Sequence, residues 1–245
     1  MSLKGKCALI TGSSRGIGSA IATAMAKEGA EVIIHYAGRM DKAQEVAARI
    51  VSEGSVCRIV QADLSDPKGA EMLFSQAGAV DILVLNASIQ FRRQWEKITV
   101  DEFYTQVNCN VLSSLLLMQK AVPAMREKHW GRIITIGSVQ EEKPHPEMLV
   151  YSATKAAQTM MSRSLALQLA KDGITVNNVA PGVIYTDRNK EALSDPDYSR
   201  RMTEGIPLGY YGDKKDCVGI VKLLCSEEGR YITGQSIFVD GGMSL

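Results

Sequence analysis

Residues 7 to 29 constrain the fold of this chain more than any other stretch. Cys7 to Ile10 is a short apolar run, which fits a β-strand that is buried on both faces. Gly12, Gly16 and Gly18 follow at once, and apolar residues then recur every four positions, as on one face of a helix. A strand, a glycine-rich turn and a helix N-terminus together form an anion site, because free backbone N–H groups and the helix dipole point at a bound phosphate. The stretch therefore favours a dinucleotide site.

The rest of the chain continues this alternation of strands and helices. Strands that alternate with helices indicate a parallel sheet built from right-handed crossovers. We expect a single doubly wound, Rossmann-type α/β domain over residues 1–245, with helices on both faces of a seven-stranded parallel sheet and an irregular substrate loop at about 183–212. The expected strands are 7–10, 31–36, 56–60, 80–86, 133–137, 174–180 and 235–239, and the later helices are 41–53, 66–78, 100–128, 149–171 and 213–228.

Composition and charge exclude several classes of protein. A net charge of +1 gives no case for binding nucleic acid or an anionic membrane surface, and no run approaches the length of a membrane span. The first strand begins by about residue 6, which leaves no room for a signal peptide, so we expect a cytoplasmic protein. The five cysteines contain no C-x-x-C pair and are expected to be reduced thiols. The three histidines lack metal-ligand spacing, so we expect no metal.

The segment TGSSRGIG, from Thr11 to Gly18, resembles the cofactor motif of the short-chain dehydrogenase/reductases. Motifs near residues 86, 110, 138, 151 and 181 and the segment YITGQSIFVDGG near the end extend this resemblance over essentially the whole chain. It implies a nicotinamide cofactor and oxidoreductase chemistry. Within the glycine turn, the implied cofactor contacts are Gly12, Ser14, Arg15, Gly16, Ile17 and Gly18.

The ends of the other predicted strands supply further cofactor contacts, because ligands of an open parallel sheet lie outside the carboxyl ends of its strands. After the second strand the sequence is HYAGR, without the acid that would bind the ribose hydroxyl of NAD. Arg39 and Arg15 can instead face a 2′-phosphate, unless they are merely solvated, so we expect NADP(H) to be preferred and NAD(H) to be possible. Strand ends and resemblance together give Tyr36, Asp63, Leu64, Asn86, Ala87, Ser88, Tyr151, Lys155, Pro181, Gly182, Ile184 and Thr186. Ser88 stands where the family usually has glycine.

Tyr151 and Lys155 are the candidates for proton transfer. They are four residues apart on one predicted helix, so their side chains share a face. A free tyrosine has a pKa near ~10, and a nearby ammonium favours its phenolate, which suits a general acid or base. Ser138, at the end of a strand, would bond the same substrate oxygen. By resemblance, Asn110 completes the catalytic set, bends its helix and holds a water on the lysine.

Two other classes of function compete with a simple oxidoreductase. A cofactor-binding regulator without catalysis would be indicated by loss of Ser138, Tyr151 or Lys155, and all three are present. An epimerase or dehydratase on this scaffold usually has a longer chain with an added substrate domain. The sequence therefore favours an oxidoreductase acting on a carbonyl or secondary alcohol.

The substrate is less constrained, because the chain resembles 3-oxoacyl-acyl-carrier-protein reductases and bacterial sugar or polyol dehydrogenases about equally. An acyl-carrier protein is acidic, so its reductases tend to place basic residues beside the active-site mouth. The two corresponding positions here are His129 and Asp172. The loop after Ser138 is polar, and Gln140 or His145 can bond hydroxyls. We therefore favour a small polar substrate, with the carrier-protein reductase as the alternative.

The helices at about 100–128 and 149–171 carry more apolar surface than one sheet face can cover. By resemblance, the family pairs these helices across a two-fold axis and often builds tetramers. We expect the chain to associate with itself as a homodimer or homotetramer. The alternative is a monomer with a generous core.

Overall fold

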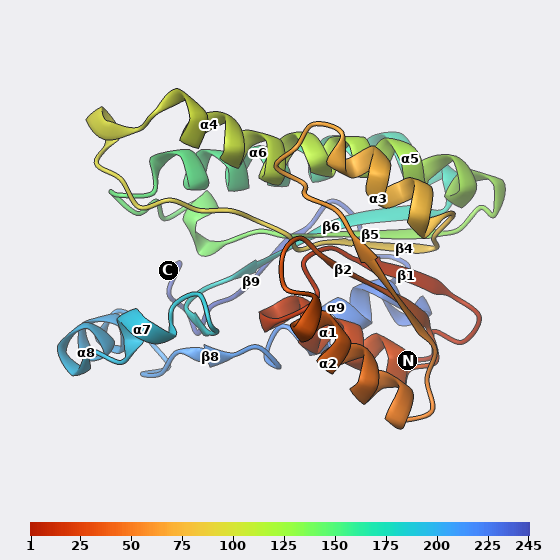
Figure 1. Ribbon diagram of the computed structural model, residues 1–245, viewed down its shortest axis with the longest axis horizontal. Coiled ribbons are helices and arrows are strands. Elements are labelled where there is room, and N and C mark those ends of the chain that lie inside the picture. Colours follow the sequence, from red (N-terminus) through yellow and green to blue (C-terminus); the bar gives the residue numbers. More distant parts are fainter.

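A seven-stranded parallel sheet runs through the centre of the molecule in a computed structural model that describes all 245 residues (Figure 1). The strand order is β3-β2-β1-β4-β5-β6-β9. The order reverses at β1, which pairs with β2 on one side and β4 on the other, so the chain has a topological switch point there. This confirms the predicted Rossmann-type fold. The strands are β1 (Cys7–Ile10), β2 (Glu31–Tyr36), β3 (Cys57–Gln61), β4 (Ile82–Leu85), β5 (Gly131–Ile136), β6 (Ile174–Pro181) and β9 (Ser236–Val239).

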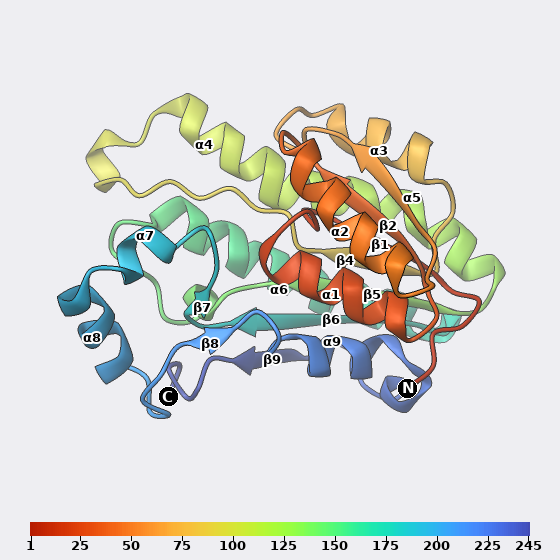
Figure 2. The ribbon, with the colours of Figure 1, turned by 60° about the horizontal axis from the view of Figure 1, so that its bottom comes forward.

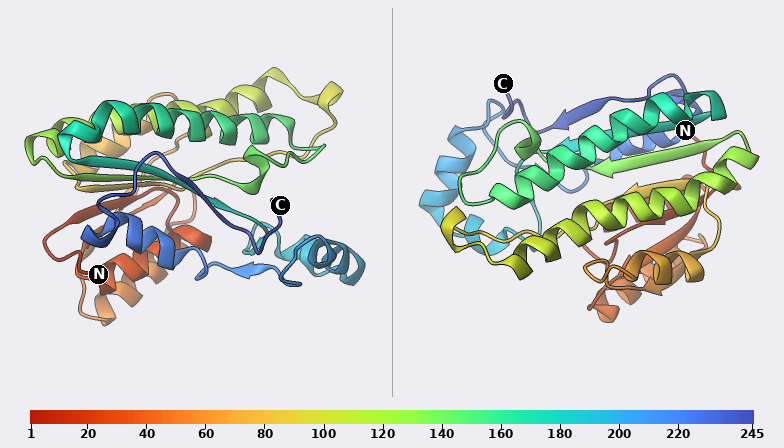
Figure 3. Two further views of the ribbon diagram at one scale, coloured as in Figure 1. Left: turned by 180° about the vertical axis from the view of Figure 1, so that it is seen from behind. Right: turned by 90° about the horizontal axis from the view of Figure 1, so that it is seen from above.

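Helices cover both faces of this sheet, as Figures 1 and 3 show from opposite sides. One layer consists of α1 (Gly16–Lys27), α2 (Met40–Ser52) and α9 (Val218–Cys225). The other layer consists of α3 (Gly69–Ala77), α4 (Val100–Val107), α5 (Ser113–Glu127) and α6 (Leu149–Leu169). None of the helices combines the length and the apolar character that a membrane span requires.

The first strand shows why the central strands are apolar throughout. Successive residues of a strand face opposite sides of the sheet, so Ala8 and Ile10 pack into the α1 layer while Leu9 packs into the α5 layer. Leu9 lies in register with Ile33 of β2 and Leu83 of β4, and all three are fully buried. Both faces of the sheet are covered, so an apolar run appears instead of an alternating pattern.

The predicted helix over residues 100–128 is interrupted by one π-helical turn at Asn108–Leu112, between α4 and α5. A capping box at Thr99 and Glu102 begins α4. The π turn accommodates one extra residue without ending the helix, and it contains Asn110. The sequence analysis expected a bend at this residue from family resemblance alone.

The start of α3 differs from the expected residue 66. Asp66 accepts a hydrogen bond from Lys68 N at 2.8 Å, and the Asp66 carbonyl accepts one from Gly69 N at 2.8 Å. These bonds close a turn before the helix, which therefore begins at Gly69. Asp66-Pro67 marks this turn and not a helix cap.

The segment 183–212, expected to be irregular, contains ordered elements (Figure 2). Asp195 accepts bonds from Asp197 N and Tyr198 N, and Pro196 occupies the first turn of α8. Asp195-Pro196 is a typical sequence signal for the start of a helix, and the sequence analysis missed it. The elements are β7 (Ile184–Tyr185), α7 (Lys190–Leu193), α8 (Pro196–Glu204) and β8 (Gly212–Asp213). The strands β7 and β8 form a two-stranded parallel sheet. The following helix, α9, is shorter than the predicted helix over residues 213–228.

Candidate active site

The glycine turn is tied to the end of β4 at the switch point of the sheet. Asn86 Nδ2 donates to the carbonyl of Thr11 at 2.9 Å and to that of Gly12 at 3.0 Å. In return, Thr11 Oγ1 accepts from the backbone N–H of Asn86 at 2.9 Å and of Ala87 at 3.0 Å. Four bonds therefore fix the relative position of the two strand ends that border the predicted cofactor site.

The glycines of this turn are required by conformation and by space. Gly12 and Gly16 have φ of 62° and 59°, in the left-handed region that favours glycine. A Cβ on Gly18 would lie 2.5 Å from Asn86 Nδ2 and 2.6 Å from the Gly12 carbonyl oxygen. No side chain caps the first turn of α1, where Arg15 is the N-cap residue, so the first backbone N–H groups are available to an anion.

His35, at the end of β2, supports the same turn and was not among the predicted site residues. Its Nδ1 accepts from Gly12 N at 2.9 Å, and its Nε2 lies 3.0 Å from the Ala62 carbonyl. These contacts require a neutral ring that carries its proton on Nε2. Burial lowers the pKa of His35 to about 4. A polar residue inside an otherwise apolar strand was the sequence signal for this role.

We expect acid to destabilise the fold through His35. The folded pKa of about 4 lies below the ordinary 6.5, so the unfolded chain binds more protons between these values. Stability is complete above pH 6.5 and is lost as the pH falls toward 4, by about 3 kcal/mol from this residue. Urea unfolding at pH 7, 5.5 and 4.5 measures the loss. His35→Gln should flatten this dependence and exposed His129→Gln should not, and an unchanged slope in His35→Gln would contradict the assignment.

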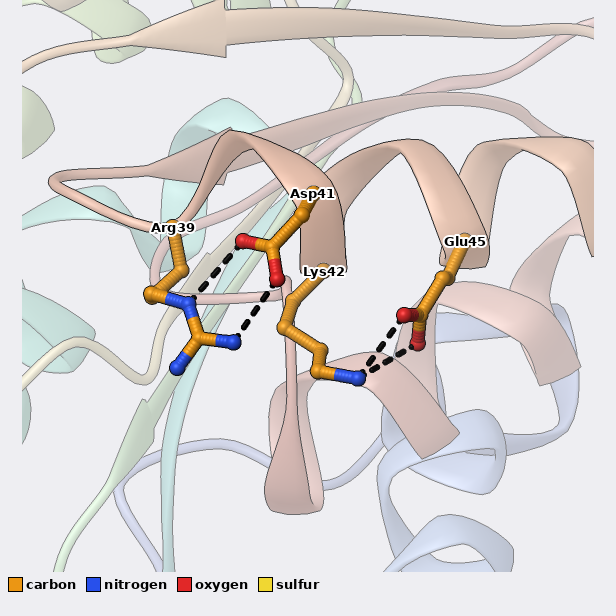
Figure 4. Close-up of polar contacts among 4 residues, drawn as sticks. All are labelled: Arg39, Asp41, Lys42 and Glu45. Atoms are coloured by element: carbon orange, nitrogen blue, oxygen red, sulfur yellow. Dashed lines mark hydrogen bonds and ion pairs between the residues drawn. The ribbon is translucent and has the colours of Figure 1, made fainter.

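Arg39, predicted to face a 2′-phosphate, forms a bidentate pair with Asp41 at the start of α2 (Figure 4). Its Nε donates to Oδ1 at 2.9 Å and its Nη2 to Oδ2 at 2.7 Å. The guanidinium holds the pKa of Asp41 at about 2. The pair is exposed, and Lys42 and Glu45 form a similar one beside it. Asp41 lies two residues beyond the stretch in which the sequence analysis found no acid.

The remaining predicted cofactor residues gather at the carboxyl ends of the strands, although some side chains have other partners. Asp63 accepts from the backbone and hydroxyl of Ser65, as a turn residue does. The side chains of Tyr36 and Leu64 are buried in the two core layers. Pro181 and Ile184 are buried, and Ser14, Ile17, Gly182 and Thr186 are partly buried.

Tyr151 and Lys155 occupy one face of α6, and the Lys155 Nζ lies 5.6 Å from the centre of the Tyr151 ring. Both side chains are buried. Lys155 Nζ donates to the Ile136 carbonyl at 2.7 Å and to Gln158 Oε1 at 2.9 Å. Burial lowers the pKa of Lys155 to about 7. Ser138 follows β5, and its Oγ accepts from Gln140 N at 3.2 Å.

Asn110 ties the loop after β4 to α6. Its Oδ1 accepts from Ile89 N at 2.8 Å, and its Nδ2 donates to the Ile89 carbonyl at 2.9 Å and to Thr154 Oγ1 at 3.0 Å. Its side chain therefore holds Ile89, in the loop after β4, against Thr154, the residue before Lys155. Lys155 itself bonds the last carbonyl of β5, two residues before Ser138. With Tyr151 beside Lys155, these contacts gather the predicted catalytic residues at the carboxyl end of β5.

Comparison with known proteins decides the family. Residues 12–244 match the family model described as "Enoyl-(Acyl carrier protein) reductase". The chain is 39% identical over 246 residues to a 3-oxoacyl-[acyl-carrier-protein] reductase of Staphylococcus epidermidis, covering 98% of this chain and 99% of that protein. It belongs to the short-chain dehydrogenase/reductases. A 3beta-hydroxysteroid dehydrogenase of Eggerthella lenta is 35% identical over 248 residues, covering 99% of this chain and 95% of that protein.

Solved structures of other short-chain dehydrogenase/reductases superpose closely. A 3-oxoacyl-(acyl-carrier-protein) reductase from Agrobacterium tumefaciens with NADP bound has a TM-score of 0.94 and 36% identity, covering 98% of this chain and 95% of that one. A gluconate 5-dehydrogenase from Burkholderia cenocepacia, in complex with NADP and tartrate, has a TM-score of 0.90 and 32% identity, covering 99% and 96%. The predicted family and enzyme class are confirmed.

Behind Ser138, this short-chain dehydrogenase/reductase holds a carboxylate that the sequence analysis treated only as part of a polar loop. Glu141 accepts from Thr159 Oγ1 at 2.8 Å, from Asn178 Nδ2 at 2.9 Å and from Ser236 Oγ at 2.5 Å. Its charge is thus shared among donors from α6, β6 and β9. The network anchors the turn that begins at Ser138.

Two arginines and three loops border the open side of the site. Arg188, after β7, donates to the Ser88 carbonyl at 2.8 Å and to Ser88 Oγ at 3.1 Å. A glycine at position 88 could not supply that second bond. Arg92 donates to the Tyr198 hydroxyl of α8 at 3.1 Å. Burial, with Arg92 nearby, lowers the pKa of His145. The loops after β4, β5 and β7 therefore meet at the open side of the site, and each of them contributes polar side chains there.

Proposed function

We propose that this chain is an NADP(H)-dependent oxidoreductase for the carbonyl or secondary alcohol of a small polar substrate, with Tyr151 as general acid and base. The position of Tyr151 beside the buried ammonium of Lys155, with Ser138 at the end of the adjacent strand, carries the proposal. Membership of the family supports it, as does the NADP bound in the two solved relatives.

The residues present fit a dinucleotide. The uncapped first turn of α1 suits its diphosphate, and Gly18 lets the glycine turn and Asn86 pack closely against the start of that helix. The ends of β4 and β6 suit the nicotinamide half of the dinucleotide. When bound, the nicotinamide supplies or accepts the hydride. Tyr151 gives its phenolic proton to the substrate oxygen in reduction and takes the hydroxyl proton in oxidation, while Ser138 Oγ donates a hydrogen bond to that oxygen. The charge on Lys155 stabilises the phenolate that remains.

The preference for NADP(H) is proposed from Arg39 and Arg15 at the edge of the site. Arg39→Ala should weaken NADPH binding about ten- to a hundredfold, because a hydrogen bond to a charged group is lost, and should hardly change NADH binding. Arg15→Ala should act in the same direction but less. Asp41→Asn should strengthen NADPH binding severalfold, because the competing carboxylate of the pair is removed. Fluorescence titration with both cofactors measures these changes, and equal native affinity for both would defeat the proposal.

The expectation that His129 and Asp172 lie beside the active-site mouth is wrong within one protomer. They precede β5 and β6, at the amino ends of the strands, whereas Ser138 and the other site residues lie at the carboxyl ends. Asp172 also accepts from Arg126 at 2.7 Å. Support for a small polar substrate comes instead from the polar loop that carries His145. The two arginines at the mouth, Arg92 and Arg188, suit an acidic carrier protein as well and so support the alternative.

The test compares NADPH-dependent reduction of an acetoacetyl thioester, free and carrier-bound, with reduction of keto-sugars and diketones. We expect higher kcat/KM on the small polar ketones. A clearly higher value on the carrier-bound thioester would make the chain a 3-oxoacyl-acyl-carrier-protein reductase, which is the alternative proposal and which its relatives in Staphylococcus also support.

We also propose a homodimer or homotetramer in which α4, α5 and α6 form the contact. These helices lie side by side over one face of the sheet in Figure 3, and large apolar side chains are exposed on them. The exposed residues are Val100, Phe103, Tyr104, Leu115, Leu149, Met160 and Leu167. Covering such a patch is favourable. Sedimentation equilibrium at micromolar concentration should show a dimer or larger, and a 26.6 kDa species would contradict the proposal.

The proposed cytoplasmic location is supported by the cysteines. All five are free in the fold. Burial raises the pKa of Cys109 to about 11 and that of Cys217 and Cys225 to about 12, so these thiols stay protonated and unreactive. Free thiols of this kind are typical of proteins that fold in a reducing compartment.

A further inference from the structure

Lys155 carries its ammonium into the interior, and both of its hydrogen-bond acceptors are neutral. Besides burial, which lowers its pKa, three further groups act on that pKa without bonding the lysine: Arg188 lowers the pKa, and Cys109 and Glu141 raise it. The Lys155 side chain is 1% exposed, and its two hydrogen bonds go to the Ile136 carbonyl and to Gln158 Oε1. An ammonium has three N–H donors. Two are therefore held by these acceptors, which leaves a third N–H on an ammonium that lies 5.6 Å from the centre of the Tyr151 ring.

Gln158 is itself fixed from the opposite side. It is fully buried on α6, and its Nε2 donates to Ser114 Oγ at 2.9 Å. Ser114 Oγ uses its own proton to bond the Asn110 carbonyl at 2.8 Å, so it can only accept from Gln158. The Gln158 amide therefore turns its nitrogen to Ser114 and its oxygen to Lys155. This chain of hydrogen bonds begins at the carbonyl of Asn110, which lies in the π turn.

We propose that Gln158 is a positioning residue that holds the Lys155 ammonium toward Tyr151, and that Ser114 keeps the Gln158 amide oxygen facing Lys155. The inference rests on the proposed function, because it gives Lys155 a part in proton transfer. Gln158 reaches the reacting atoms only through Lys155.

The amide oxygen matters because the ammonium is buried. Burial already brings the pKa of Lys155 to about 7, so the charged form is marginal at neutral pH. Removing one of its two acceptors disfavours the charged form further. A larger share of Lys155 is then neutral at pH 7, and Tyr151 loses the positive charge that stabilises its phenolate.

The test compares Gln158→Met, which keeps length but has no strong acceptor, with Gln158→Glu, which keeps an acceptor toward Lys155. In Gln158→Met we expect kcat for ketone reduction at pH 7 to fall about tenfold and the alkaline limb of the pH profile to move about one unit lower. Gln158→Glu should return the limb to its native position or above. Ser114→Ala should shift it as Gln158→Met does, but less. Exposed Gln168→Met on the same helix is the matched control and should change nothing.

A purely structural role for Gln158 predicts the opposite order, because a buried carboxylate costs more than a buried methionine. The inference is overturned if Gln158→Met is more active than Gln158→Glu, or if its alkaline limb stays in place while circular dichroism shows a native fold.

A second measurement needs neither cofactor nor turnover. Competitive acetylation of the cofactor-free protein with acetic anhydride, followed by peptide mass spectrometry, titrates the Lys155 amine. We expect the midpoint to fall by about one unit in Gln158→Met and not in Gln168→Met. An unchanged acetylation midpoint of Lys155 in Gln158→Met would contradict the inference, even if the chain proves to be a reductase. If Tyr151→Phe keeps native turnover, the proposed function fails, while the acetylation midpoint still decides the role of Gln158.

Discussion

Replacing Tyr151 by phenylalanine is expected to lower kcat about 10²- to 10⁴-fold, the usual loss when a general acid or base is removed. The substitution deletes one oxygen from a buried side chain on a packed helix, so the fold and the affinity for NADPH should change little. Stopped-flow reduction of the best ketone, with NADPH binding measured by fluorescence, separates these effects.

The matched control is Tyr231→Phe, which removes the same oxygen from a fully exposed tyrosine. It should keep native turnover. Near-native turnover in Tyr151→Phe would show that another group transfers the proton.

Gly18→Ala is expected to abolish tight cofactor binding. The added Cβ would lie 2.5 Å from Asn86 Nδ2 and 2.6 Å from the Gly12 carbonyl, the two atoms whose bond links the glycine turn to β4. Overpacking of this kind costs about 1–3 kcal/mol, and separating the bonded pair adds roughly 1–3 kcal/mol. We expect a fall in Tm of several degrees and at least about a hundredfold weaker NADPH binding, because the first turn of α1 moves relative to the strand ends.

Gly38→Ala gives the control for this experiment, because a Cβ at Gly38 meets no atom within 4 Å. It adds the same methyl group to a nearby loop at the same edge of the sheet. Calorimetry and isothermal titration of both variants should separate them clearly. Native NADPH affinity in Gly18→Ala would contradict a cofactor site at the glycine turn.

Local patterns gave most of the fold and the predicted catalytic group. The glycine turn is encoded in eight consecutive residues, and Tyr151 and Lys155 are one helical turn apart, so their proximity needs no tertiary information. The roles of His35 and Gln158 depend on partners far along the chain, Gly12 and Ser114, which only the folded sheet brings near.

What the sequence analysis left out or placed wrongly has physical causes. The pairing of Arg39 with Asp41 competes with the ligand that Arg39 was expected to bind, and a motif does not show such competition. His129 and Asp172 were placed at the wrong end of the sheet because their positions came from resemblance and not from strand direction. The helices within 183–212 are short, and their apolar faces were too small to produce a clear period.

The π turn at Asn108–Leu112 sets a limit on how this chain can change its length. The turn takes up one residue more than a regular helix needs for the same rotation, so α4 and α5 keep the phase of one continuous helix. Deleting one residue at this turn would leave a regular helix in that same phase, with Leu117 and Met118 still covered. Asn110, however, would lose the position from which it bonds Ile89 and Thr154. Deleting a residue elsewhere in α5 would instead rotate everything after it by about 100°. The fold of this helix therefore tolerates the loss of a residue only at the π turn, which is where the candidate site does not.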